Sequence, residues 1–187
     1  MNRRLLALLL LLAAALSLAW WVNELSRPES PPSRATRDTP DSYANGLRVM
    51  RYDDHGRLIQ SLRSPRMLSF DQTGVTEFTQ PEVRQYAEDK PPWILQAEKG
   101  IARHREQHLM LPGEVVIDRA GFEEAAPYHI RTRDLAVQMP DVHVSTDQPV
   151  SLISGEQRMT ARGLEAWLKE PARLQLLHQV RGHYEFE

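Results

Sequence analysis

Cysteine is absent from this chain of 187 residues. Its absence excludes disulfides, thiolate metal sites, cysteine catalysis and a lipid-modified cysteine at the N-terminus. Acidic and basic side chains nearly balance, because the formal net charge is −2, and no long block of either sign occurs. Such a chain lacks the concentrated positive charge that is typical of nucleic-acid-binding proteins. The 13 prolines and 9 glycines are spread along the chain, which favours many turns over long helices.

The chain also lacks the short motifs that carry catalysis or nucleotide binding. It contains no Gly-x-Ser-x-Gly, no Ser-x-x-Lys and no phosphate-cradling glycine loop. His104 and His108 have a spacing that suits metal ligands on a helix, but in a strand such residues lie roughly 13 Å apart. The adjacent carboxylates Asp53–Asp54 and Glu123–Glu124 are typical of solvated turns. We therefore expect no enzymatic activity, no metal and no cofactor.

One long apolar run is present, and it comes near the start of the chain. From Leu5 to Val22 there is no charge, and about 18 helical residues span roughly 27 Å, close to the thickness of a bilayer's hydrocarbon core. Trp20 and Trp21 suit the interfacial aromatic belt, and Arg3–Arg4 favour a cytoplasmic N-terminus. We predict a transmembrane anchor over residues 5–22 with the rest of the chain outside the cytoplasm, which in a Gram-negative cell means the periplasm.

Two alternatives to an anchor are open at this point. Ser17-Leu18-Ala19 resembles the small-x-small cleavage site of a secretory signal peptide. The run could instead form a buried helix of a soluble domain. The apolar run continues without a break through Trp20-Trp21-Val22, so we favour the uncleaved anchor.

The next stretch predicts a linker. Residues 26–45 have almost no large apolar side chains and contain several prolines, at positions 28, 31, 32 and 40. This composition is typical of an extended, poorly ordered segment. We therefore divide the chain into a cytoplasmic tip and anchor at 1–24, a linker at 25–45 and a periplasmic domain at 46–187.

Strict alternation of apolar and polar residues dominates the remaining chain and predicts strands. Residues Leu47–Tyr52 and Arg57–Leu62 flank the turn signal Asp53–Gly56, which predicts a hairpin. The same alternation recurs at residues 93–98, 135–139, 142–145 and 164–169. Further turn signals follow every eight to twelve residues or so, among them Asp71–Gly74, Pro112-Gly113, Pro140-Asp141, Gln148-Pro149 and Glu170-Pro171.

A weak internal repeat sharpens this picture. Similar short segments recur about every 30 to 35 residues, at 80–83, 112–115, 148–150 and 178–180. A meander of short strands cannot bury its apolar face alone, so successive repeats must stack into an elongated sheet. Such a sheet has two open ends, and an unpaired strand edge is a docking site for another β-protein.

The order of several motifs resembles that of the LptC family, the lipopolysaccharide export proteins of the Gram-negative inner membrane. The motifs that carry this resemblance follow the apolar run in this order: Tyr52-Asp53-Asp54-His55-Gly56, Phe78-Thr79-Gln80-Pro81, Pro92-Trp93-x-Leu95-x-Ala97-Glu98-Lys99, Leu111-Pro112-Gly113-Glu114-Val115, and Ser154-Gly155 before Gly163-Leu164. The resemblance covers nearly the whole chain. Each motif is short, and their order and spacing behind an N-terminal anchor make the resemblance specific.

This resemblance implies an elongated, twisted β-jellyroll with open-ended, V-shaped antiparallel sheets, preceded by one transmembrane helix. It further implies that the chain receives lipopolysaccharide from an inner-membrane ABC transporter complex. The lipid then passes along an apolar groove to LptA, a soluble periplasmic bridge protein of similar fold. A homodimer through the sheet edges is an open alternative, as is a tethered structural module that docks another β-protein without carrying lipid.

A lipid conduit needs an apolar interior, and the alternating apolar positions are its candidates. An ordinary packed sandwich core uses the same pattern, and only the open ends and the resemblance favour a groove. The predicted groove residues are Leu47, Val49, Phe78, Trp93, Leu95, Leu109, Leu135, Val137, Leu152, Leu174 and Tyr184. The predicted partner-binding edge consists of Val180, Arg181, Gly182, His183 and Tyr184. Gly113 and Gly155 are expected to be structural, with Gly155 at a bend that a side chain would block.

Overall fold

The computed structural model describes residues 39–103, 108–139 and 141–183. Every regular element within these residues is a strand, and the strands pair antiparallel in one sheet, which confirms the predicted all-β class. Among the same residues, no helix is long and apolar enough to cross a bilayer. The predicted anchor at 5–22 lies outside the described residues, as does Tyr184.

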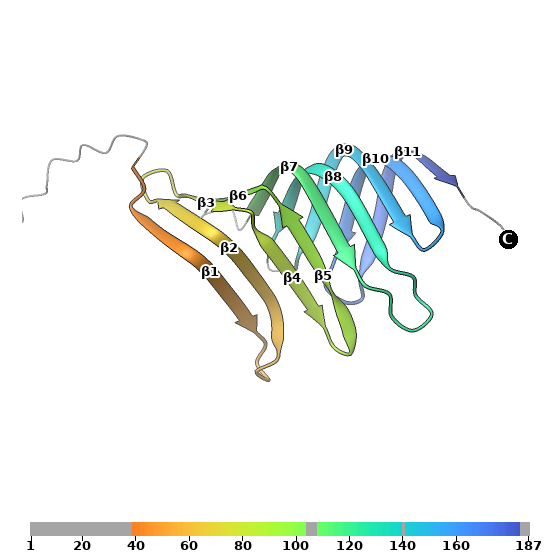
Figure 1. Cartoon of the computed structure of the whole chain (residues 1–187), viewed down its shortest axis with the longest axis horizontal. Coiled ribbons are helices and arrows are strands. Elements are labelled where there is room, and N and C mark those ends of the chain that lie inside the picture. The colour runs from red at the N-terminus through yellow and green to blue at the C-terminus, as the bar shows by residue number, and fades with distance from the viewer. Residues whose placement is uncertain (1–38, 104–107, 140, 184–187) are drawn as a thin grey trace, which may run out of the picture. The chain divides into compact units, whose positions relative to one another are not determined.

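Eleven strands follow one another along the described chain (Figure 1): β1 Ser42–Tyr52, β2 Leu58–Phe70, β3 Val75–Thr79, β4 Glu82–Ala87, β5 Lys90–Ala97, β6 Lys99–Arg103, β7 His108–Arg119, β8 Tyr128–Gln138, β9 His143–Ser154, β10 Gln157–Trp167 and β11 Arg173–His183. The predicted hairpin is confirmed, because β1 pairs with β2 on either side of the turn at Asp53–Gly56. β1 starts at Ser42, ahead of the predicted domain start at residue 46, since Ser42–Asn45 pair with Arg66–Ser69 of β2.

The long strands divide their length between two layers of the sheet. In β2, Gln60–Arg63 pair with β4, whereas Arg66–Phe70 pair with β3. In β7, Val115–Asp118 pair with β5, whereas His108–Met110 pair with β6. We call the part built on β4 and β5 the first layer and the part built on β3 and β6 the second layer. Strands β8 to β11 continue both, with residues 128–133, 149–154, 157–162 and 180–183 in the first layer and 135–139, 143–146, 164–167 and 173–178 in the second.

Each long strand bends where it passes from one layer to the other. From β7 to β11 the register between neighbouring strands shifts at the bend, whereas β1 and β2 stay in register there. Residues with positive φ occupy the bends of β7, β8, β10 and β11: Gly113 at 82°, Asp134 at 50°, Gly163 at 86° and Gln179 at 51°. Glycine adopts this conformation without steric cost, and a single extra residue in the strand bends it while its pairing continues on both sides. These bends lie side by side and form a crease along the sheet.

Two predicted turns are wrong for this reason. Pro112-Gly113 lies within β7, and Gln148-Pro149 lies within β9. Both residue pairs are typical of turns. The strand nevertheless continues through each of them, because the neighbouring strands bend beside it. The predicted turns at Asp71–Gly74 and Glu170-Pro171 do connect successive strands and are confirmed.

Buried hydroxyl groups satisfy backbone carbonyls along the crease. The Ser64 hydroxyl lies 2.7 Å from the Thr79 carbonyl oxygen, and Thr132 Oγ1 donates to the Pro149 carbonyl at 3.1 Å. Thr146 Oγ1 donates to the Arg133 carbonyl at 2.8 Å. A bend removes ladder hydrogen bonds, and a buried carbonyl left without a donor costs about 1–3 kcal/mol. Small polar residues at these positions therefore make the bends possible inside a buried region.

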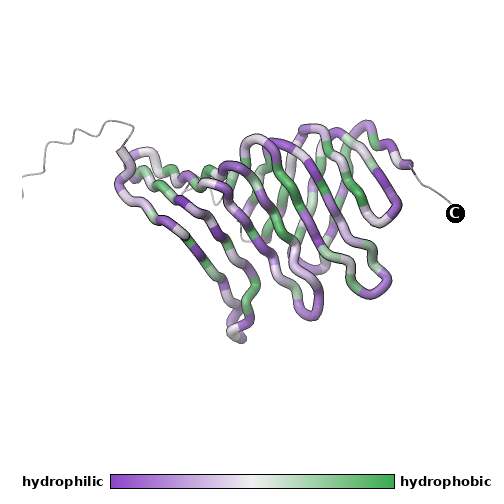
Figure 2. The backbone as a smooth tube through the Cα atoms, in the orientation of Figure 1, coloured by the Kyte–Doolittle hydropathy of each residue, from purple (hydrophilic) through white to green (hydrophobic). Residues whose placement is uncertain are grey.

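Cross-strand register explains which residues form the interior. One inner row runs across the first layer through Val49, Leu62, Val83, Leu95, Ile117, Ile130, Leu152 and Met159. The neighbouring outer row runs through Arg48, Arg63, Glu82, Gln96, Val116, Arg131, Ser151 and Thr160. Hydrophobic and hydrophilic residues alternate along the strands accordingly (Figure 2). The period-2 pattern of the sequence thus becomes an apolar inner face and a polar outer face.

Gly163 provides a stability test of the crease. A Cβ atom at this position would lie 3.1 Å from Leu177 Cδ1 and 3.2 Å from Leu177 Cβ, and φ is +86°. At Gly113 φ is +82°, but a Cβ atom would meet nothing within 4 Å. We expect Gly113→Ala to lower the free energy of unfolding by about 1–2 kcal/mol through backbone strain, and Gly163→Ala by about 1–2 kcal/mol more through crowding. Guanidinium unfolding of both variants measures this difference, and equal losses would show that crowding by Leu177 contributes nothing.

Candidate functional site

The predicted groove residues lie on the inner face, but they differ in exposure. Six of them are buried: Trp93, Leu95, Leu109, Leu135, Val137 and Leu152. Leu47, Phe78 and Leu174 are half-buried, and Val49 is 48% exposed. Tyr184 lies outside the described residues. Sequence and register therefore bring these residues to one side of the sheet, while their role in binding lipid stays a prediction.

Exposure varies along the inner rows of the two layers. In the first-layer row, the central residues from Val83 to Leu152 are at most 4% exposed, whereas Leu62 and Met159 are half-buried. In the second-layer row, exposure rises toward β11, from Leu109 at 5% and Val137 at 0% to the half-buried Leu174, whereas toward β1 the row runs through the buried residues Thr76 and Ser69. The interior is thus tightly packed in the middle and more exposed at both ends of the first layer and at the β11 end of the second.

Several interior residues were not predicted from the sequence. They are the buried residues Val83, Leu111, Val115, Ile117 and Ile130. The segment Val115-Val116-Ile117 has no alternation of apolar and polar residues, because the outward-facing Val116 is apolar too. The sequence pattern therefore did not indicate which of these side chains are buried. Val83 and Ile130 stand out only once the cross-strand register is known.

The two terminal strands of the sheet carry exposed apolar side chains. β1 pairs only with β2 among the described strands, and it exposes Tyr43 at 71%, Met50 at 47% and Tyr52 at 54%. β11 pairs only with β10 among those strands, and its exposed apolar residues are Leu177 at 38% and Val180 at 53%. Strand edges with apolar side chains are suited to pairing with a strand of another protein.

The predicted partner-binding edge lies in the last part of β11. Arg181, Gly182 and His183 pair with Thr160, Met159 and Arg158 of β10. All three residues are exposed, as is Val180. Their backbone groups on the side away from β10 face no other described strand. The binding of a partner at this edge stays a prediction.

Gly155 occupies the turn between β9 and β10. Its φ is +59°, and a Cβ atom there would lie 3.3 Å from the Ala126 Cβ. The positive φ and this close approach agree with the predicted bend.

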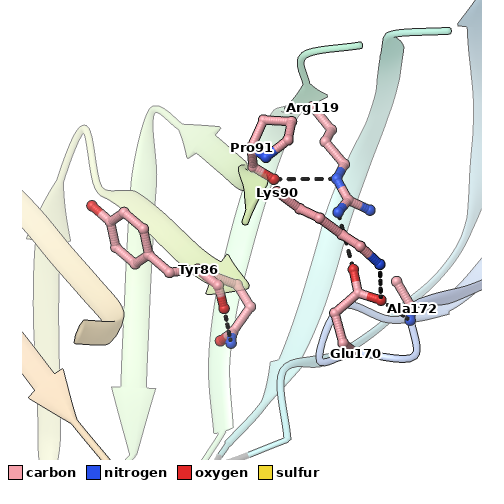
Figure 3. A network of polar contacts seen from close by, with 7 residues as sticks. Tyr86, Lys90, Pro91, Arg119, Glu170 and Ala172 are labelled. Atoms are coloured by element: carbon pink, nitrogen blue, oxygen red, sulfur yellow. Dashed lines mark hydrogen bonds and ion pairs between the residues drawn. The ribbon is translucent and has the colours of Figure 1, made fainter. Parts of the chain in front are cut away.

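A network of charged side chains joins the two layers across the side opposite the crease (Figure 3). Glu170 lies in the turn between β10 and β11, on the second layer. Arg119 Nη2 donates to Glu170 Oε1 at 3.0 Å, and Lys90 Nζ donates to Glu170 Oε2 at 3.4 Å. Lys90 begins β5 and Arg119 ends β7, both in the first layer. The ion pairs Arg57–Asp53, Arg84–Glu82 and Lys169–Asp141 each stay within one layer.

Glu170 is ionised near neutral pH in this setting. Burial raises the pKa of its carboxyl group, but hydrogen bonds from the Ala172 amide, Arg119 and Lys90 outweigh burial, so the pKa lies below its ordinary value. Arg119 is held in place within the first layer, because its Nε donates a hydrogen bond to the Pro91 carbonyl oxygen at 3.2 Å. The carboxylate is therefore shared between two cations that the first layer positions.

Trp93 forms the floor beneath this network. Its ring centroid lies 5.6 Å from that of Tyr128, and the Arg119 guanidinium carbon lies 5.0 Å above it. A guanidinium at this distance is attracted by the ring's negative face. The indole Nε1 is buried and has no hydrogen-bond partner among the described residues. A buried donor of this kind is uncommon in native proteins.

The described residues contain no cluster of three or more histidines or carboxylates that could hold a metal ion. His108 is exposed at the start of β7, and His104 lies outside the described residues. Two histidines do contact carboxylates, since His129 Nδ1 lies 2.5 Å from Asp118 Oδ1 and His143 Nε2 lies 2.9 Å from Glu165 Oε1. Both pairs lie on the outer face of the sheet.

Comparison with known proteins gives one clear match. The family model of lipopolysaccharide-assembly, LptC-related proteins matches residues 7–185, which cover the whole described part of the chain. No match was found among curated proteins. The matched length far exceeds half of the 187 residues. The chain therefore belongs to the LptC-related family of lipopolysaccharide assembly.

Proposed function

We propose that this chain is a non-enzymatic relay that receives lipopolysaccharide at one end of its sheet and passes it on at the other. The observation that carries the proposal is the apolar inner face between the two layers, whose first-layer row is continuous in register from β1 to β10 and more exposed at both ends than in the middle. Family membership supplies the lipid class. Each Å² of apolar surface that acyl chains hide there contributes roughly 25 cal/mol.

The two terminal strands supply the partner surfaces in this proposal. β1 docks on the inner-membrane ABC transporter complex, and β11 pairs with LptA, the soluble bridge protein of similar fold. Exposed apolar residues on both strands and their unpaired edges support this assignment. A transmembrane anchor at residues 5–22 holds β1 near the transporter, with the domain in the periplasm. The energy for transport comes from ATP hydrolysed elsewhere, because the sequence has no nucleotide-binding motif.

A second candidate function is a tethered interaction module that docks other β-proteins and carries no lipid. One observation favours it: among the residues that the structure describes, 18 apolar ones form a buried core, and those of its central rows are almost fully enclosed. Lipid passage requires the two layers to separate in this region, whereas docking through β1 and β11 does not. The two functions therefore differ in whether the inner face ever contacts cargo.

Site-specific photo-crosslinking separates the two functions. With a photo-reactive amino acid at Phe78 or Leu174, we expect capture of lipopolysaccharide in cells with an active transporter, because both residues are half-buried on the inner face. The matched control is Arg131, which is exposed on the outer row and should capture little lipid. Capture of protein alone at Phe78 and Leu174 would support the tethered module and contradict the relay.

A further inference from the structure

We infer that Lys90 and Arg119 form a binding site for a phosphate monoester group of the lipid cargo, and that Glu170 occupies this site when cargo is absent. The inference rests on the relay function proposed above. The structure itself shows that the two cations can hold one anion together, since each donates to a different oxygen of the same carboxylate, at 3.0 and 3.4 Å. A phosphate group presents oxygens in the same manner and binds such donors strongly.

The first layer holds Arg119 in place through contacts that involve no anion. Arg119 is fixed by its hydrogen bond to the Pro91 carbonyl and by the face of Trp93 beneath it. Its side chain is only 14% exposed, so it has little freedom to turn away. Lys90 precedes Pro91 directly in β5 and is 45% exposed. A buried, fixed guanidinium beside a half-exposed ammonium suits a ligand that must enter and leave.

The space around the two cations is large enough for a headgroup. A cavity of about 540 Å³ is lined by Lys90, Arg119, Tyr128 and Glu170, together with the loop that connects β7 and β8. This cavity lies at the rim, the side opposite the crease where Glu170 bridges the two layers, and Arg119 in its lining lies over the ring of the buried Trp93. A lipid whose acyl chains lie between the layers would therefore have its charged end at this rim.

The local charge balance favours exchange over permanent capture. Glu123 and Glu124 also line the cavity, so the site has no large excess of positive charge. Glu170 competes with an incoming phosphate for the same two donors. A relay must release its cargo, and an internal carboxylate that returns to the cations assists this release. When Glu170 moves away from the two cations, the ion pairs between the layers break. Headgroup binding is thereby coupled to separation of the two layers on the side opposite the crease.

Opposite effects of two substitutions test this site. Both Glu170→Gln and Lys90→Gln break the pair between Lys90 and Glu170. Glu170→Gln removes the competing anion, so we expect about threefold to tenfold tighter binding of bisphosphorylated lipid A to the full chain in detergent. Lys90→Gln removes a donor, so we expect binding weaker by a similar factor. Thermophoresis of the labelled chain measures both, and thermal unfolding checks that each variant is folded.

Two further ligands and one control variant make the test specific. With fully dephosphorylated lipid A, neither substitution should change binding; with inorganic phosphate, the directions should be those seen with the lipid. The control Lys169→Gln breaks an ion pair to Asp141 within the second layer and should change nothing. If Glu170→Gln and Lys90→Gln shift lipid binding in the same direction, the network only links the two layers through ion pairs, and the phosphate site is refuted. Capture of lipid at Phe78 together with that result would leave the relay intact while excluding this site.

Discussion

Replacing Leu135 with alanine is expected to lower the free energy of unfolding by about 2–5 kcal/mol, the largest effect of any single truncation considered for this sheet. Leu135 is 0% exposed and pairs with Leu111, which is 1% exposed, directly beside the crease residue Asp134. Truncation removes apolar contacts and leaves a cavity that rigid neighbouring strands cannot close. Since single domains have only about 5–15 kcal/mol of stability, this loss is a large fraction of the total.

The control for this prediction is Leu177→Ala in β11. Leu177 is 38% exposed, so its truncation should cost less than about 1 kcal/mol. Guanidinium unfolding of the full chain in detergent, followed by far-UV circular dichroism, measures both variants. A loss below about 1 kcal/mol for Leu135→Ala would contradict tight packing and would show an under-filled groove in the middle of the sheet. The same experiment therefore tests whether the middle of the sheet is packed too tightly for acyl chains to pass without separation of the layers.

Strands and their inner faces could be predicted from the sequence because the side-chain period of a strand is two. Alternation at 93–98 placed Trp93 and Leu95 inside, and the structure buries both. The hairpin at Asp53–Gly56 was predictable because the turn chemistry is local: the Asp53 carboxylate accepts hydrogen bonds from the His55 and Arg57 amides at 2.9 Å. Local chemistry and local pattern agree there.

The crease could not be predicted, because it depends on strands that are distant in sequence. Pro112-Gly113 has the residues of a turn, yet β7 continues because β8 bends beside it at Asp134, whose carboxylate accepts from the Gly113 amide at 2.8 Å. A single strand carries no sign of whether its neighbour also bends. The division of each long strand between two layers was invisible for the same reason.

The charged network on the side opposite the crease also could not be predicted from the sequence. Glu170 is 51 positions from Arg119 and 80 positions from Lys90 along the chain. All three are ordinary surface residue types, and the turn signal Glu170-Pro171 drew attention only to the backbone. Glu170 neutralises part of the charge on the two cations, and only the folded chain brings the three side chains together.

Removing residues Arg181–Glu187 is expected to weaken binding of the soluble bridge protein by more than about tenfold while leaving binding of the transporter complex unchanged. The described part of this segment, Arg181–His183, forms the end of the terminal strand β11 and pairs on one side only. Strand addition gains its affinity from backbone hydrogen bonds along a free edge, so a shortened edge loses them directly.

A variant in β1 tests the assignment of the two partners to the two edges from the other end of the sheet. Met50→Lys with Tyr52→Lys places charge on the exposed apolar surface of β1, and charged residues on an edge strand oppose pairing. We expect this double variant to lose the transporter complex and to keep the bridge protein, the opposite of the truncation. Co-purification of each variant with both partners measures the two effects. β1 and β11 lie at opposite ends of one sheet, so loss of the same partner in both variants would contradict separate docking edges. Retention of the bridge protein by the truncated chain would refute the assignment of that protein to β11.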